Sequence, residues 1–108
     1  MSKPISDQKL NRQISNFLKH LPNQAELNGE RQGSSFYRRT DEKTFIEAHR
    51  QAYSHITGLG TKFKLTNVQK KELTKTQDGI VHRVEAAFDG NDNPPANLEN
   101  FLKNRRTG

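Results

Sequence analysis

The chain has 108 residues, of which 30% are apolar, and its formal net charge at pH 7 is +6. This length corresponds to one domain over residues 1–108, and an apolar share below the usual value of about 45–50% allows only a small core, which a homodimer could enlarge. The absence of cysteine excludes disulfides, thiolate chemistry and cysteine-ligated zinc. No apolar run approaches the ~20 residues of a membrane span, so we expect a cytoplasmic protein without a membrane partner.

Positive charge is distributed unevenly along the chain. Residues 1–60 contain nine Lys and Arg against six Asp and Glu, and residues 61–77 contain five lysines against one acid. Residues 78–99 reverse the sign with five acids against one arginine, and residues 100–108 add three basic residues and no acid. Clustered positive charge favours a polyanionic partner, because each phosphate contact releases condensed counterions.

The first predicted element is an amphipathic helix over residues 7–20. Apolar residues recur at helical spacing from Leu10 to Leu21, Ser6 is a suitable N-cap, and Pro22 marks the end. Residues 22–40 then form a long loop that is rich in Asn, Gly and Ser. A short strand at Ala25–Leu27 or Ser35–Arg38 is also compatible with that stretch.

A second helix is predicted over residues 41–57. Thr40 is a suitable N-cap, and Gly58-Leu59-Gly60 supply the termination signal that glycine usually gives. The apolar stripe of this helix includes His49, which we therefore expect to be buried.

Residues 61–90 allow two interpretations. Asp78-Gly79 is the preferred two-residue hairpin turn, and residues 80–88 alternate between apolar and polar side chains as a strand does. The same region also fits a helix, because Thr66 and Gln69 are spaced as a capping box and the apolar residues of 80–88 include a helical stripe. The unbroken alternation after an Asp-Gly turn favours a strand at 80–88 that buries His82, whereas residues 66–77 fit either structure.

These elements predict one α+β domain. Two N-terminal helices pack on a small antiparallel sheet with its hairpin at Asp78-Gly79. A short C-terminal helix begins after an N-cap at Asn93 and has prolines in its first turn. A basic tail occupies residues 103–108. The alternative is an all-α arrangement of four helices, at residues 7–20, 41–57, 67–89 and 95–105.

The clustered charge makes nucleic-acid binding the first functional hypothesis: a small, non-catalytic binding or regulatory protein that contacts the phosphate backbone of DNA or RNA. Phe36 and Tyr37 adjoin two arginines and are candidates for stacking on unpaired bases. Edge-strand protection and complementation of a helix dipole are the structural alternatives for the same charges. The predicted phosphate contacts are Arg38, Arg39, Lys62, Lys64, Lys70, Lys71, Lys75, Arg105 and Arg106.

Two further hypotheses stay open. The first is a protein inhibitor of the kind that phages and plasmids encode against a host enzyme, for which small size and the lack of a catalytic motif are suitable. The second is a ribonuclease toxin that uses general acid–base catalysis by His49, His55 and His82 with Lys75. Arg50 and His55 also resemble, in two residues, the Arg-x4-His pair of the HEPN ribonucleases, and that resemblance implies RNA cleavage. No cofactor or metal site is predicted, and we expect that the protein is not an enzyme.

Overall fold

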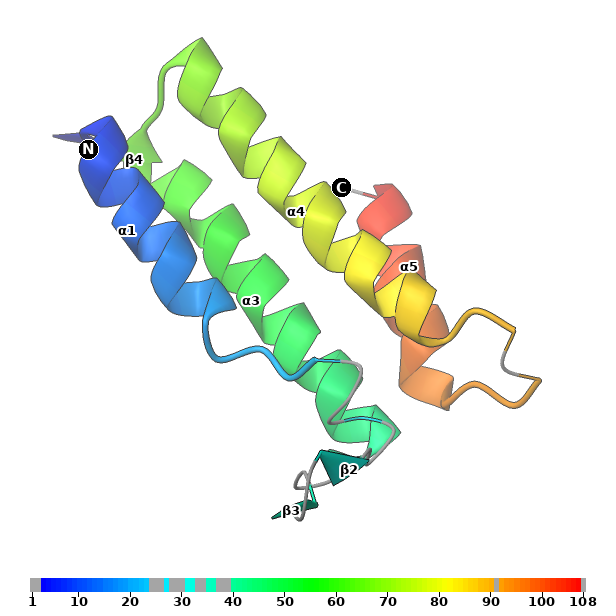
Figure 1. Cartoon of the computed structure of the whole chain (residues 1–108). Helices are drawn as coiled ribbons and strands as arrows, with labels where there is room; N and C mark the ends of the chain where they lie inside the picture. The colour runs from blue at the N-terminus through cyan, green and yellow to red at the C-terminus, as the bar shows by residue number, and fades with distance from the viewer. Residues whose placement is uncertain are drawn as a thin grey trace.

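The computed structural model describes residues 3–23, 27, 31–32, 35–36, 40–90 and 92–107. Four helices dominate these residues, and the strands are only two residues long (Figure 1). The elements in chain order are β1 (Lys3–Pro4), α1 (Asp7–Leu18), β2 (Arg31–Gln32), β3 (Ser35–Phe36), α3 (Glu42–Lys62), β4 (Phe63–Lys64), α4 (Asn67–Ala87) and α5 (Ala96–Thr107).

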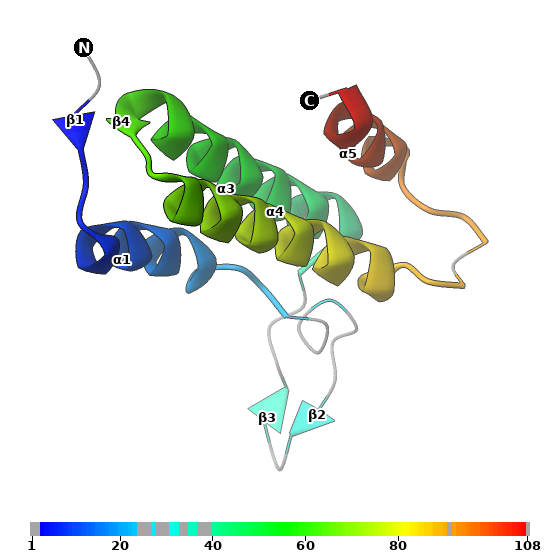
Figure 2. The same ribbon diagram turned by 90° about the horizontal axis from the view of Figure 1, so that it is seen from above.

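Helix α3 is the centre of the molecule. It runs antiparallel to α4, and the two long helices lie side by side in both views (Figures 1 and 2). Helices α1 and α5 also pack against α3, on opposite flanks of the α3–α4 pair. Each of α1, α4 and α5 therefore directs its apolar stripe toward α3. This arrangement places the core around the inner side of α3.

Side-chain oxygens define where three helices begin. Ser6 Oγ accepts a hydrogen bond from the Lys9 backbone N–H at the start of α1, as the sequence predicts. Asp41, rather than Thr40, caps α3, because its carboxylate accepts from the Thr44 N–H at 2.8 Å. Thr66 and Gln69 form the predicted capping box at the start of α4. Each cap satisfies a backbone donor that the first helical turn leaves unpaired.

The strands pair as two separate bridges. β1 pairs with β4 in parallel, with Lys3 opposite Phe63 and Pro4 opposite Lys64, which brings the start of the described chain to the α3–α4 connection. β2 and β3 pair antiparallel within the long 22–40 connection. The strand predicted at 35–38 is thus present as Ser35–Phe36.

The core joins all four helices. Its members contact one another across the inner faces of the helices, and the edge-to-face ring pair of Tyr53 and Phe101, with centroids 6.3 Å apart, links α3 to α5. Among the residues whose burial is described, the buried apolar ones are Leu10, Ile14, Leu27, Phe45, Ile46, Ala52, Ile56, Leu59, Leu65, Leu73, Ile80, Val81, Val84, Phe88, Leu98 and Phe101.

The predicted hairpin at Asp78-Gly79 is wrong, because α4 continues through both residues. Ile80, Val84 and Phe88 are spaced by four, and this spacing satisfies a period of two and a helical period equally well. Val81 decides between them. A strand would put it on the face opposite Ile80, whereas both residues are 1% exposed in the structure.

The packing of the N-terminal helices differs accordingly. α1 and α3 pack on each other and α3 packs on α4 and α5, instead of both lying on an antiparallel sheet. The helix ranges of the all-α alternative correspond to α1, α3, α4 and α5, and residues 67–77 belong to α4. His82, which the strand interpretation buried, is exposed on the outer side of α4.

Two helix boundaries also differ from the predicted ones. Gly58 and Gly60 do not end α3, which continues to Lys62 because Leu59 is buried in the core and the helix gains by extending past it. α5 begins at Ala96, after the prolines rather than with them, and Pro95 supplies a carbonyl that accepts from the Leu98 N–H.

Candidate nucleic-acid interface

Five exposed lysines gather where the α3–α4 connection meets β1. We call this region the basic end and define it as Lys3, Lys62, Lys64, Lys70 and Lys71. The parallel bridge puts the Lys3 backbone beside Phe63, the residue that separates Lys62 from Lys64. Paired strands lie about 4.8 Å apart, so three lysines from two distant segments share one small surface.

The lysines of α4 continue this surface along the helix. Lys70, Lys71, Thr74, Lys75 and Asp78 line a shallow hollow of about 410 Å³ on the exposed side of α4. From Lys70 to Lys75 the helix rises about 7.5 Å. The carboxylate of Asp78 ends the positive strip.

The helix dipole does not account for Lys70 and Lys71. Positive side chains are favourable at the C-terminal end of a helix, yet these two lie in the first two turns of α4, where the dipole is positive. The first turn of α4 also contains no acid. Edge protection of a strand is excluded for the same two residues, since they belong to a helix.

Apolar groups accompany the lysines. The Lys62 Nζ atom lies 5.5 Å from the centroid of the Phe63 ring, which is a cation–π distance. Val68, in the first turn of α4, is 68% exposed. Two acids, Asp7 at the start of α1 and Glu72 of α4, adjoin residues of the first turns of α4. Asp7 accepts a hydrogen bond from Gln69, and Glu72 lines the groove between α1 and α4.

Gln69 anchors β1 and α1 to the start of α4. The residue is only 4% exposed, and its side chain makes three hydrogen bonds, one in the capping box and two to the N-terminal segment, while its backbone N–H donates to Thr66 Oγ1. The Nε2 group donates to the Ile5 carbonyl at 2.7 Å and to Asp7 Oδ1 at 2.9 Å. A buried amide therefore ties the segment that bears Lys3 to the helix that bears Lys70 and Lys71.

Sequence reasoning missed both Lys3 and this role of Gln69. Lys3 is isolated in the sequence from the other lysines, and nothing local indicates that it pairs with residue 63. A local signal did exist for position 69. The capping box accepts Glu as well as Gln, and only Gln can donate hydrogen bonds to a second segment.

The remaining predicted contacts lie either outside the described residues or on another helix. Arg38, Arg39 and Tyr37 lie outside the described residues, and Phe36 is described only through its β3 backbone. Arg105 and Arg106 belong to the last turns of α5, on the flank of the α3–α4 pair opposite α1 (Figure 1).

The four residues of the acid–base hypothesis do not converge. His49 is fully buried in α3, where Nδ1 lies 2.8 Å from the Phe45 carbonyl and Nε2 accepts from Arg83 Nε at 3.3 Å. A carbonyl can only accept, so Nδ1 carries the proton and the ring is neutral. Burial, and secondarily the charge of Arg83, lower the pKa of His49, although the Phe45 hydrogen bond opposes this.

The other members have separate surroundings. The His55 ring stacks on Phe17 of α1, with centroids 5.0 Å apart. Lys75 and His82 are both exposed on α4, but seven residues separate them, which is about 10.5 Å along the helix. These positions give a general acid and base no common reacting atom.

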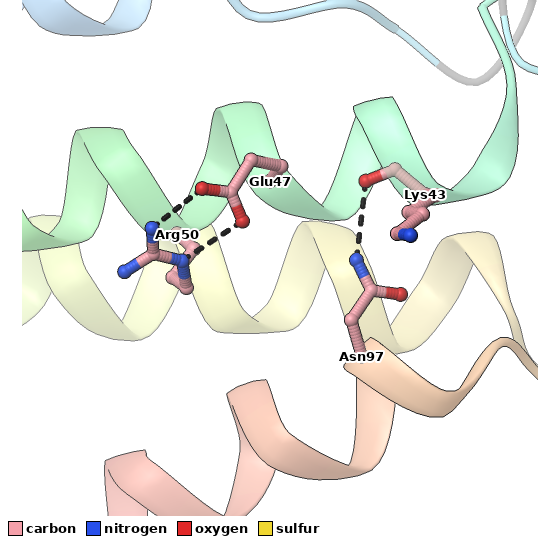
Figure 3. Close-up of polar contacts among 4 residues, drawn as sticks. All are labelled: Lys43, Glu47, Arg50 and Asn97. Atoms are coloured by element: carbon pink, nitrogen blue, oxygen red, sulfur yellow. Dashed lines mark hydrogen bonds and ion pairs between the residues drawn. The ribbon is translucent and has the colours of Figure 1, made fainter.

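The Arg-x4-His pair is also separated. Arg50 Nε donates to Glu47 Oε2 at 2.9 Å, and its Nη2 donates to the other carboxylate oxygen (Figure 3). Residues five apart point about 140° away from each other around a helix, so Arg50 and His55 serve different faces. The Arg50 hydrogen bonds lower the pKa of Glu47, and the carboxylate raises that of Arg50.

A groove between α3 and α5 lies beside this ion pair. Asn97 Nδ2 donates to the Lys43 carbonyl at 3.2 Å, which fixes the orientation of its amide (Figure 3). Thr44, Ala48 and Gln51 complete the lining. Among the residues that the structure describes, no three His, Asp or Glu side chains are grouped as a metal site would require.

Comparisons with protein-family models, with curated proteins and with solved structures find no match to this chain. Within the described residues, none of the helices is both long and apolar enough to span a bilayer.

Proposed function

We propose that this protein binds the phosphate backbone of a nucleic acid through its basic end. The single observation that carries the proposal is the β1–β4 bridge, which adds Lys3 to the lysines of the α3–α4 connection and the first turns of α4. Lysines present point charges to phosphates and carry no base-reading fork, so binding is expected to be independent of nucleotide sequence.

The charges are arranged to favour this function over simple solvation. Lys70 and Lys71 oppose the local helix dipole, and like charges at close spacing destabilise the folded chain. A bound polyanion removes both costs.

The test is a titration of fluorescent duplex and single-stranded oligonucleotides between about 50 and 300 mM salt. If all five lysines of the basic end contact phosphate, log K against log[salt] has a slope of about −4.5 for duplex DNA and about −3.5 for single strands. In the double variant Lys70→Gln/Lys71→Gln, the duplex slope becomes shallower by about 1.8.

A matched control uses the same charge change elsewhere. Lys19 directly follows α1, and Lys43 is the second residue of α3, so both lie at the helix ends that do not adjoin β1 and β4. The variant Lys19→Gln/Lys43→Gln should keep the wild-type slope. Equal loss in both double variants, or no affinity for any oligonucleotide at 50 mM salt, would contradict the proposal.

A further inference from the structure

We infer that Gln69 is the positioning residue of the basic end: its amide holds the N-terminal segment so that Lys3 belongs to the binding surface. The inference rests on the proposed function for the role of Lys3, whereas the positioning itself stands on hydrogen bonds within the folded chain. Gln69 contacts no partner directly, since its side chain is buried.

The first step is the orientation of the amide. The Ile5 carbonyl can only accept a hydrogen bond, so the group 2.7 Å from it is Nε2. Oε1 then faces the Thr66 N–H at 2.9 Å and completes the capping box. The second N–H of Nε2 donates a hydrogen bond to Asp7 Oδ1, so every polar hydrogen of the side chain has an acceptor.

The second step separates positioning from helix capping. A glutamate at position 69 would cap α4 as well and would complement its dipole better. It could not donate to Ile5 or Asp7, and its charge would repel the Asp7 carboxylate. The part of the contact that requires glutamine is therefore the pair of donated hydrogen bonds to Ile5 and Asp7. These acceptors are distant in the sequence, with separations of 64 and 62 positions from Gln69.

The third step connects the amide to Lys3. β1 has only two residues, and a bridge of this length has little stability of its own. Ile5 follows β1 directly and Asp7 begins α1, so the two acceptors lie immediately after the bridge. Without the Gln69 contacts, the segment that bears Lys3 retains the bridge to Phe63 and Lys64 and the packing of Ile5 against the core, but no hydrogen bond to α4.

A double-mutant cycle tests this coupling. Lys3→Gln in the wild-type background should make the duplex salt slope shallower by about 0.9, the value of one phosphate contact. In a Gln69→Met background the same change should have a smaller effect, because the Gln69 contacts no longer hold Lys3 at the surface. Equal effects of Lys3→Gln in both backgrounds, or none in either, would overturn the inference.

Thr66→Ala is the matched control, because it removes the other half of the capping box and leaves both donated hydrogen bonds of Gln69 in place. Lys3→Gln should act in this background as it does in the wild type. Loss of the Lys3 effect here as well would assign the coupling to capping and would also overturn the inference.

Hydrogen exchange of the backbone amides of residues 3 and 5–7 gives a readout that does not depend on nucleic acid. These amides should exchange faster in Gln69→Met and in Gln69→Glu than in Thr66→Ala, while the amides of α3 keep their protection. If wild-type protein binds no oligonucleotide but this pattern holds, the proposed function fails and the positioning stands. Unchanged exchange in both Gln69 variants contradicts the positioning itself.

Discussion

At the scale of single residues, His49 shows how a histidine on an apolar stripe can have a structural role. Its neutral ring donates to the Phe45 carbonyl and accepts from Arg83, whose Nη2 group also donates to the Pro22 carbonyl at 3.1 Å. One imidazole thereby links α3, α4 and the segment after α1. Arginine offers only donors, so a protonated ring would lose this contact and face a like charge.

This contact predicts a pH dependence of stability. The pKa of His49 is lowered in the folded state, so the unfolded chain binds a proton first as the pH falls below about 6.5. The free energy of unfolding should be level above pH 7, fall below the unfolded pKa and level off once the folded pKa is passed. One proton limits the slope to about 1.4 kcal/mol per pH unit.

Urea unfolding between pH 7.5 and 5 measures this slope. The lowered pKa values of Asp41 and Glu47 act below this window, because their ordinary values are 3.8 and 4.5. His49→Gln should remove most of the slope, and His82→Gln, at an exposed position of α4, should retain it. A wild-type slope in His49→Gln would show that another group is responsible.

At the scale of elements, α4 separates what the sequence could predict from what it could not. Local signals predicted the N-caps of α1 and α4 and the course of α1, since caps and helical stripes are read over a few residues. The strand prediction failed because an apolar spacing of four residues also has a period of two. An Asp-Gly pair then favoured the wrong alternative.

For the candidate site, too, the sequence indicates the local features and not the tertiary contacts. Its lysines were visible as a local excess of charge, but the bridge between residues 3 and 63 and the contacts of Gln69 are tertiary. They depend on how α1 and α4 approach each other, and no pattern over a short window records that approach.

A substitution at Gly79 tests the helical course of α4. Gly79 lies in the helix interior, and a Cβ atom there would meet nothing within 4 Å. Gly79→Ala should therefore increase the free energy of unfolding by about 0.5–1 kcal/mol in a urea titration. Gly90→Ala is the contrasting case. Its φ of +77° disfavours any side chain, and we expect a loss of about 1 kcal/mol or more. Destabilisation by Gly79→Ala would instead fit a turn at this position.

At the scale of the whole molecule, charge and shape are both asymmetric. The molecule measures 48 × 33 × 19 Å, and its shortest dimension is about two helix diameters, which suits a chain with only 30% apolar residues. The basic end lies at one end of the α3–α4 pair. Asp41 and Glu42 at the start of α3 lie at the other, together with Asp89 and Asp92 after α4.

This asymmetry predicts that salt acts in opposite directions on folding and on binding. Screening weakens repulsion among the five lysines of the basic end, so the free energy of unfolding should rise by a few tenths of a kcal/mol or more between about 50 and 500 mM NaCl. Affinity for an oligonucleotide should fall over the same range. Thermal unfolding of Lys70→Gln/Lys71→Gln should show a smaller salt effect than wild type or Lys19→Gln/Lys43→Gln. An equal effect in all three proteins would place the repulsion elsewhere.

The β1–β4 bridge also has a consequence for the order of folding. Residues 3 and 63 are separated by 60 positions, and closing a flexible loop of that length costs about 3.6 kcal/mol of chain entropy. A two-residue bridge cannot repay this cost alone, so we expect it to form after α1 has packed on α3 and shortened the loop. The surface that gathers the lysines would then be assembled in the last folding step. It would also be the first part of the native chain to open, well before the helices separate.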